Sequence, residues 1–290
     1  MYSPTRISIG SCAWSFEDWR GVFYPEHLPA GARLAFYSRH FGAVEIDSTF
    51  YHAPSPAVAE HWLEVTPADF VFTAKVPREI THERKLRESG AAMGEFLAAI
   101  APLRPKLACV LIQLPPYFHV KQDELALREF LQDLPAGWRF AVEFRQHEWH
   151  LPRIAHLLEG LGICWTWSDL TPLDHAPEGP FEFMPQTADF SYVRLMGELE
   201  TKYRGDGTRI HRYRALEWPR DGALESWAVR IRQRLATCKR VLVFANNHYE
   251  GFSPHTCARL AEKLGVAAQL PTPEELLGQS ASDAAQLHLL

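Results

Sequence analysis

The sequence lacks the features that mark exported, membrane-spanning and strongly basic proteins. No apolar run approaches the roughly 20 residues of a membrane-spanning helix. The opening residues, MYSPTRISIG, contain no apolar run typical of a signal peptide. The formal net charge of −5 provides no global positive field that would attract nucleic acid or anionic lipid. We therefore expect a cytoplasmic protein without a membrane partner.

Cysteine is scarce, and the spacings of common metal sites are missing. The five cysteines are dispersed and form no CxxC pair, which predicts reduced thiols and argues against a cysteine-bound zinc ion. The histidine spacings HxH and HExxH are also absent. The sequence therefore requires no cofactor, and the identity of any cofactor stays unknown at this point.

Eight short β-type runs recur along the chain, most of them separated by amphipathic segments, and this alternation predicts a parallel sheet. The predicted strands are Ile7–Ala13, Ala43–Ser48, Phe70–Val76, Ala108–Leu114, Phe140–Arg145, Ile163–Ser168, Ser191–Gly197 and Val241–Asn247. The predicted helices are Ala32–Phe41, Pro56–Val65, Arg84–Ile100, Gln122–Leu134, Leu151–Gly160, Leu224–Cys238 and Pro254–Leu264.

The faces of the strands distinguish an open sheet from a closed barrel. In the second strand Val44 and Ile46 share one face and Glu45 lies on the other, because successive side chains alternate. The third, fifth and seventh strands also place a charged residue opposite their apolar face. An open sheet with helices on both faces would bury these charges at high cost. A barrel places them in its lumen near the mouth, so the pattern favours closure.

We therefore predict an α/β fold with a single (β/α)8 TIM-type barrel. The 290 residues suit such a barrel, which takes about 250, so that residues 1–270 form the barrel and residues 271–290 a C-terminal tail with one short helix. The sixth unit is irregular from Leu170 to Asp189, and the seventh loop, from about Glu198 to Trp218, is long. Ser253 is predicted to cap the last barrel helix, with Pro254 at its first position.

Active sites of such barrels lie at the carboxyl ends of the strands, and the residues at these positions are unusually polar. Glu45 and Glu143 are candidate catalytic acids or bases, because neighbouring cations or burial can shift the pKa of a lumenal glutamate in either direction. The alternative is a structural network of salt bridges that fills the barrel. We expect Glu45, Lys75, Glu143 and Arg194 to point into one shared pocket.

Other polar residues at the strand ends suit the binding of an anionic substrate. Lys75 and Arg194 can hold a carboxylate or phosphate group, Arg194 through a bidentate fork. Asn246 and Asn247 can orient a polar ligand, although asparagine is equally typical of turns at strand ends. The full predicted substrate-binding set is Lys75, Gln113, Arg145, Arg194, Asn246, Asn247, Tyr51 and Trp14.

Three other kinds of site stay open. Glu45, Asp47, Glu143 and His248 are suitable ligands for a divalent metal, but the neighbouring lysine and arginines would repel a cation, so we predict no metal ligands. A two-carboxylate glycosidase would use Glu45 and Glu143. Cys12, at the end of the first strand, is a candidate nucleophile, whereas a lone buried cysteine is more often a small hydrophobe.

Two regions of loop carry further candidate ligand contacts. Aromatic residues of the first two loops suit either stacking on a sugar or base or a hydrophobic lid: Trp14, Phe16, Trp19, Phe23, Tyr24, Phe50 and Tyr51. The segment Lys202–Arg214 of the seventh loop is strongly basic and contains Gly205 and Gly207 as hinges, which predicts a mobile anion-binding lid over the mouth. The same segment makes nucleic acid an alternative partner.

Seven segments, in order along the chain, together resemble the YecE-like family, also known as domain of unknown function seventy-two. They are GSCAWSFEDWRGVFYPEHLP, VEIDSTFYHAPS, FTAKVPREITHERKL, LIQLPP, AVEFRQHEW, YVRLMG and FANNHYEGFSPHTCARL. The resemblance runs from about Ile9 to Leu264 and implies a TIM-type barrel but no activity. The family often has Asn where Asp47 stands, which weakens an essential acid role there, and a glycine-aromatic-Ser run near Cys12, which counts against a catalytic cysteine. By fold analogy alone, the similarity to the endonuclease-IV and xylose-isomerase-like group favours phosphodiester or sugar chemistry.

The leading functional prediction is an enzyme, a hydrolase or lyase, that acts on a small anionic or phosphorylated polar substrate at the C-terminal mouth of the barrel. One alternative is a nucleic-acid-binding or metal-dependent phosphodiesterase-like protein. The other is a non-catalytic binder of small molecules.

Overall fold

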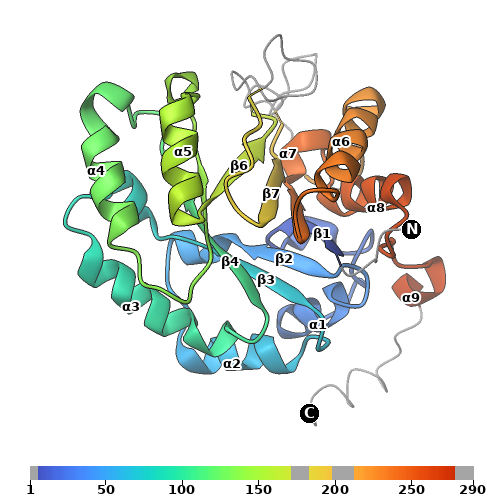
Figure 1. Ribbon diagram of the computed structural model, residues 1–290. Helices are drawn as coiled ribbons and strands as arrows, with labels where there is room; N and C mark the ends of the chain where they lie inside the picture. Colours follow the sequence, from blue (N-terminus) through green and yellow to red (C-terminus); the bar gives the residue numbers. More distant parts are fainter. Residues whose placement is uncertain (1–5, 171–182, 198–211, 278–290) are drawn as a thin grey trace.

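The computed structural model, which describes residues 6–170, 183–197 and 212–277, contains a closed ring of eight parallel strands (Figure 1). The strands pair in chain order, and the last returns to the first. They are β1 (Ile7–Cys12), β2 (Ala43–Ile46), β3 (Val71–Lys75), β4 (Leu107–Gln113), β5 (Phe140–Glu143), β6 (Cys164–Ser168), β7 (Phe190–Leu195) and β8 (Arg240–Ala245). The predicted TIM-type barrel is confirmed, and every strand lies within two residues of its predicted bounds.

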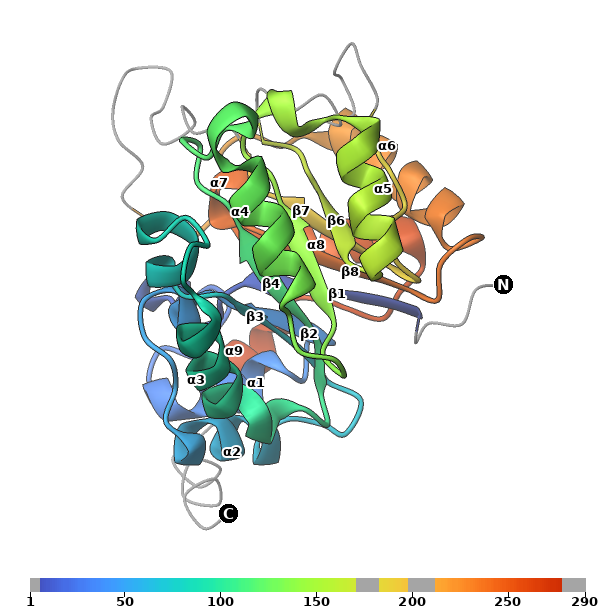
Figure 2. The same ribbon diagram turned by 60° about the vertical axis from the view of Figure 1, so that its left-hand side comes forward.

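Helices cover the outside of this ring, as Figure 2 shows for α3, α4 and α5. The helices are α1 (Arg33–Tyr37), α2 (Pro56–Glu64), α3 (Gly90–Ile100), α4 (Val120–Gln132), α5 (Pro152–Leu161), α6 (Asp221–Arg234), α7 (Asn247–Glu250), α8 (Ser253–Leu264) and α9 (Pro273–Leu277). Within the described residues, none of these helices is long and apolar enough to cross a membrane.

The alternation of side chains along the strands separates an outer core from the lumen. Val44, Ile46 and Val142 belong to the large apolar cluster between the strands and the helices. Leu111 and Tyr192 belong to a second, smaller cluster that fills the barrel. The faces assigned from the sequence are therefore confirmed, and the charged residues of alternate parity turn inward with the second cluster. The five cysteines are all buried and free of disulfide bonds.

Two local predictions are wrong. The helix predicted from Arg84 begins only at Gly90, because the chain first forms a π-helical turn over Glu79–Glu83 and then places Lys85, Leu86 and Glu88 at positive φ. A right-handed helix cannot continue through three such residues. At the last barrel helix, Phe252 takes the N-cap position instead of Ser253, whose hydroxyl donates to Asn247 Oδ1.

Parts of the two irregular segments lie outside the described residues. Residues 171–182 belong to the predicted irregular sixth unit, and residues 183–189, which are described, contain no helix. Residues 198–211 include most of the basic segment Lys202–Arg214, so the prediction of a mobile lid stays a prediction.

Candidate functional site

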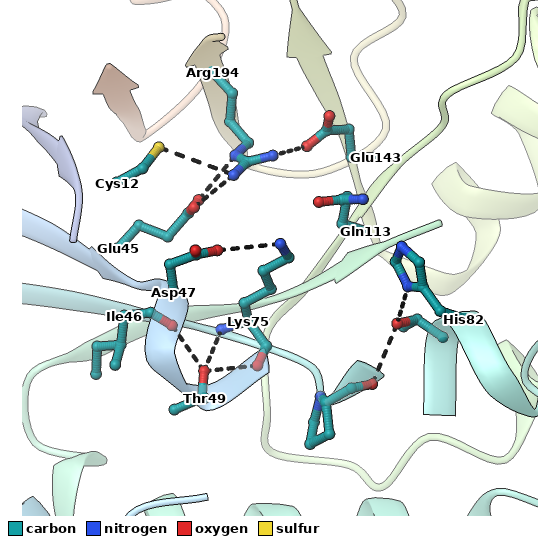
Figure 3. Close-up of polar contacts among 12 residues, drawn as sticks. Cys12, Glu45, Ile46, Asp47, Thr49, Lys75, His82, Gln113, Glu143 and Arg194 are labelled. Carbon is teal, nitrogen blue, oxygen red and sulfur yellow. Dashed lines mark hydrogen bonds and ion pairs between the residues drawn. The ribbon is translucent and has the colours of Figure 1, made fainter. Parts of the chain in front are cut away.

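Arg194 lies between two carboxylates at the centre of the barrel mouth (Figure 3). Its Nη2 and Nε donate to Glu45 Oε1 and Oε2 over 2.7 and 3.0 Å, and its Nη1 donates to Glu143 Oε2. The three residues come from β7, β2 and β5, and their side chains are at most 1% exposed. Alternating parity on separate strands has therefore brought these charges together in the lumen, where one guanidinium bonds to two carboxylates.

One further side chain, Tyr192, bonds to Glu45, and another, Cys12, lies near Arg194. The Tyr192 hydroxyl donates to Glu45 Oε2 over 2.6 Å and lies 2.8 Å from the Thr73 hydroxyl. The Cys12 thiol lies 3.9 Å from Arg194 Nη2. Burial and the nearby Glu45 carboxylate raise the pKa of Cys12 well above its usual value, so the thiol stays protonated at neutral pH. This chemistry favours the hydrophobic role of Cys12 over the nucleophilic one.

Arg145 gives Glu143 a second cationic neighbour. Its Nε lies 2.6 Å from Glu143 Oε1, although the N–H is not aligned as a hydrogen bond. Burial raises the pKa of Glu143, but the attraction of Arg145, Arg194 and Lys75 outweighs it, and the pKa is lowered overall. Glu143 is therefore ionised at neutral pH and can accept a proton but not donate one.

Lys75 lies at the mouth with most of its side chain out of solvent. Its Nζ donates to Asp47 Oδ1 over 3.1 Å and sits 4.0 Å from the centre of the Phe50 ring. The Lys75 side chain is 9% exposed, whereas that of Asp47 is 37% exposed. The Thr49 hydroxyl, 2.7 Å from the carbonyl oxygens of Ile46 and Lys75, ties the ends of β2 and β3 together. The ammonium is therefore held in place by its surroundings.

His82 belongs to this mouth, although the sequence analysis did not single it out. It follows β3 on the π-helical turn, its Nδ1 is 2.9 Å from Thr81 Oγ1, and its ring contacts Phe50 edge to face at 4.9 Å. Burial, together with the positive charges of Lys75, Arg145 and Arg78, lowers its pKa to about 4. A single histidine produces no periodic pattern in the sequence. The only signal was the polar pair Thr81-His82, which follows the end of a predicted strand.

Two more polar side chains occupy the strand ends. Gln113, at the end of β4, is 7% exposed, and Figure 3 shows its amide between Glu143 and His82. Asp169, just after β6, accepts the N–H groups of Met196 and Gly197 over 2.5 and 3.2 Å. Burial raises the pKa of Asp169 to about 6, although these two bonds lower it. Asp169 therefore titrates close to neutral pH.

The asparagine pair at the end of β8 makes the contacts of a helix start. Asn246 is the N-cap of α7 and accepts the N–H of His248 over 3.0 Å. Asn247 is 3% exposed, and its Oδ1 accepts the N–H and the hydroxyl of Ser253 over 3.0 and 2.8 Å. These bonds are the turn chemistry that the sequence left as an alternative. Ligand binding by the pair stays a prediction.

The aromatic residues of the first loops divide into two sets. Trp19, Phe23 and Tyr24 are completely buried in the outer core, so of the two possibilities that the sequence left open, stacking on a ligand has no support for these three. Trp14 is 9% exposed and packs edge to face on Trp62, whereas Tyr51 is 64% exposed. Only Tyr51 of the two predicted binding aromatics is therefore open to solvent.

A cavity of about 620 Å³ flanks the mouth between the loops that follow β2 and β3 and the helix α3. Phe50, which contacts both Lys75 and His82, is part of its lining. The lining residues are Phe50, Tyr51, His52, Ala53, Pro77, Arg78, Glu79, Ile80, Glu83, Ala92, Glu95 and Phe96. The mouth therefore adjoins space for a small molecule.

The carboxylates considered as metal ligands are bonded to cations. Glu45 and Glu143 both contact Arg194, and Asp47 contacts Lys75. Across the described parts of the chain, no group of three or more His, Cys, Asp or Glu side chains is arranged to hold a metal ion. The glycosidase and metal alternatives receive no support from this arrangement.

Comparison with known proteins gives the chain a family but no activity. Residues 8–278 match the family described as protein of unknown function DUF72. The chain is 35% identical to the UPF0759 protein YecE of Escherichia coli K12 over 139 residues, and this match spans about half (48%) of each protein. It is 26% identical to the UPF0759 protein YunF of Bacillus subtilis 168 over 93% of this chain and 99% of that protein.

Solved structures agree with this assignment. The crystal structure of a DUF72 family protein of Thermotoga maritima has a TM-score of 0.72 at 29% identity, covering 89% of this chain and 97% of that one. A DUF72 family protein of Enterococcus faecalis shares the fold, with a TM-score of 0.72 at 19% identity over 92% and 98% of the two chains. Barrel, motifs and family match together place this chain in the DUF72 family of proteins of unknown function.

Proposed function

We propose that this protein is an enzyme, a hydrolase or lyase, that binds a small anionic or phosphorylated polar substrate at the C-terminal mouth of its barrel. Lys75, Arg145 and Gln113 would contact the anion. Glu45 and Glu143 would keep Arg194 and Arg145 in position.

The burial of Lys75 and its single hydrogen bond are the main support for this proposal. The Lys75 side chain is only 9% exposed, and among the described residues its ammonium makes one hydrogen bond, to Asp47. An ammonium has three N–H donors, and donors removed from water without acceptors are costly. A substrate oxygen at this position would satisfy them. Burial is the main cause of the lowered pKa of His82, and the positive charges of Lys75, Arg145 and Arg78 lower it further.

The roles of the two glutamates follow from their contacts. Both side chains are closed off from solvent and bonded to Arg194, so a substrate would reach them only after the cluster opened. Proton transfer by Glu45 and Glu143 therefore stays a prediction from the sequence. Substrate binding by Arg194 also stays a prediction, because its three nitrogens already donate to the two carboxylates.

Calorimetric titration with inorganic phosphate and small organic phosphates tests the anion site. We expect Lys75→Met to weaken binding roughly 10- to 100-fold, the worth of a hydrogen bond to a charged group. Lys239→Met is the matched control, because Lys239 is 79% exposed and precedes β8 at the opposite end of the barrel. Equal affinity of the wild type and Lys75→Met would contradict the proposal. Turnover of a panel of phosphate esters and hydroxy acids separates an enzyme from a non-catalytic binder.

A further inference from the structure

The hydrogen bonds around His82 restrict which of its ring nitrogens carries the proton. Nδ1 is 2.9 Å from Thr81 Oγ1, and Thr81 Oγ1 lies 3.2 Å from the carbonyl oxygen of Pro77. The Thr81 hydroxyl has one proton, so it donates either to Pro77 or to His82. Both bonds exist together only when Thr81 donates to Pro77 and the His82 Nδ1–H donates to Thr81. In that tautomer Nε2 has no proton and presents a lone pair.

The surrounding charges favour the same tautomer. Burial and the positive charges of Lys75, Arg145 and Arg78 disfavour an added positive charge on the ring of His82. An Nε2–H bond would point its positive end to the side of the ring on which Lys75 lies (Figure 3), whereas a lone pair there is attracted to the ammonium. The neutral ring is the form present at pH 7.

The second ring nitrogen is directed at the space where the anion would bind. Figure 3 shows Nδ1 on the Thr81 side of the ring and Nε2 on the side of Gln113 and Lys75. In the described part of the chain, Nε2 has no hydrogen-bond partner. The edge-to-face contact with Phe50 fixes the plane of the ring, so the direction of this lone pair is set by packing.

We propose that His82 Nε2 accepts a hydrogen bond from a hydroxyl group of the substrate, so that the substrate class is a hydroxylated anion, such as a hydroxy acid or the phosphate ester of a polyol. This inference rests on the proposed anion site, with Lys75 taking the anionic group.

The tautomer is measured without any ligand. Long-range ¹H–¹⁵N correlation spectra of the imidazole rings assign the bonded proton, and the spectrum of His82→Gln identifies the His82 signals among the 14 histidines. We expect the proton on Nδ1 in the wild type and in Thr81→Ser, and its transfer to Nε2 in Thr81→Val, which has no acceptor. A wild-type proton on Nε2 would overturn the inference.

Matched pairs of ligands test the substrate class. Glycerol phosphate and propyl phosphate, or lactate and propionate, differ by hydroxyl groups. We expect the wild type to prefer the hydroxylated member about fivefold, the worth of one neutral hydrogen bond. His82→Phe keeps the ring packing and should lose the preference, whereas Lys75→Met should weaken both members. Equal wild-type binding within both pairs overturns the inference and leaves the anion site standing. Binding of no anion overturns the proposed function and this inference with it.

Discussion

Arg194 and Arg145 provide two positive charges for the two buried carboxylates of Glu45 and Glu143. A buried ion pair is balanced between the cost of leaving water and the attraction of its partners. Loss of one member therefore leaves an uncompensated charge in the barrel. This balance makes the cluster a structural unit whose members are sensitive to substitution.

The amide in Glu143→Gln keeps the shape of the side chain but removes the charge that Arg145 and Arg194 share. We expect a loss of roughly 3–5 kcal/mol in the free energy of unfolding, measured by denaturant titration. Glu225→Gln is the control, because Glu225 is 54% exposed and pairs with Lys263 on the surface, where about 1 kcal/mol or less is at stake. A loss from Glu143→Gln as small as that of the control would return Glu143 to the candidates for proton transfer.

Asp169 makes stability depend on pH in the opposite direction to most carboxylates. Its pKa of about 6 in the folded protein lies above the ordinary value of 3.8, so the folded state keeps the proton that the unfolded state releases. Its contribution is therefore fully present below pH 3.8 and is lost as the pH rises through 6.

The variant Asp169→Asn removes this titration. We expect its free energy of unfolding, relative to the wild type, to rise between pH 4 and pH 6 by roughly 2 kcal/mol, since one pKa unit corresponds to about 1.4 kcal/mol and Asp169 is only half ionised at pH 6. Denaturant unfolding at both pH values measures the difference, in which all other titrations cancel. A difference that does not change with pH would show that Asp169 is ionised in the folded state throughout this range.

The positions of the charged side chains were predictable from the sequence, but their partners were not. Alternation along a strand places Glu45, Glu143 and Arg194 in the lumen whatever their neighbours are. Which cation meets which carboxylate depends on the register between strands that are far apart in the chain. His82 was missed for a related reason, because its place at the mouth depends on an irregular turn after β3.

That connection between β3 and α3 is also the least regular described part of the backbone. Lys85, Leu86 and Glu88 all have positive φ, a conformation that costs a side-chain-bearing residue about 1–2 kcal/mol. The amphipathic pattern of 84–89 predicts a helix there, and tertiary contacts override it: Leu86 is buried, and Lys85 Nζ donates to the carbonyl oxygen of Tyr117 over 3.1 Å. The bounds of the strands were predictable because a short segment in which apolar and polar residues alternate fits few structures other than a β-strand.

Glu88 offers a test of this strain, because its side chain is exposed and its φ is +48°. Glycine relieves the steric cost but loses more entropy on folding, so we expect Glu88→Gly to stabilise the protein by about 0.5–1 kcal/mol. Glu129→Gly, at an exposed position inside α4, should destabilise it by about 1 kcal/mol. Thermal unfolding of both variants gives the signs, and a lower melting temperature for Glu88→Gly would rule out strain at this residue.

The barrel and the C-terminal region are expected to be separable. No residue of α9 is buried, and Leu277 is 88% exposed, whereas Val266, Ala268 and Leu270 pack on the outer core. Because such a truncation removes the buried Pro271 but otherwise only half-buried or exposed described residues, we expect a chain that ends at residue 270 to unfold with a free energy within about 1 kcal/mol of the full chain. A chain that ends at Leu264 is the control and should be clearly less stable. Equal, large losses in both would refute a tail that begins at residue 271.

The cluster around Arg194 joins parts of the chain that are far apart in sequence. Arg194 and Glu45 are separated by 149 residues, and Arg194 and Glu143 by 51. Contacts between residues so far apart in the chain require loop closure, whose entropic cost precedes the free energy gained from the contact. We therefore expect these contacts to form late in folding. Interactions that are absent from the folding transition state act on the rate of unfolding. We therefore expect substitutions in the charged mouth to change the rate of unfolding more than the rate of folding.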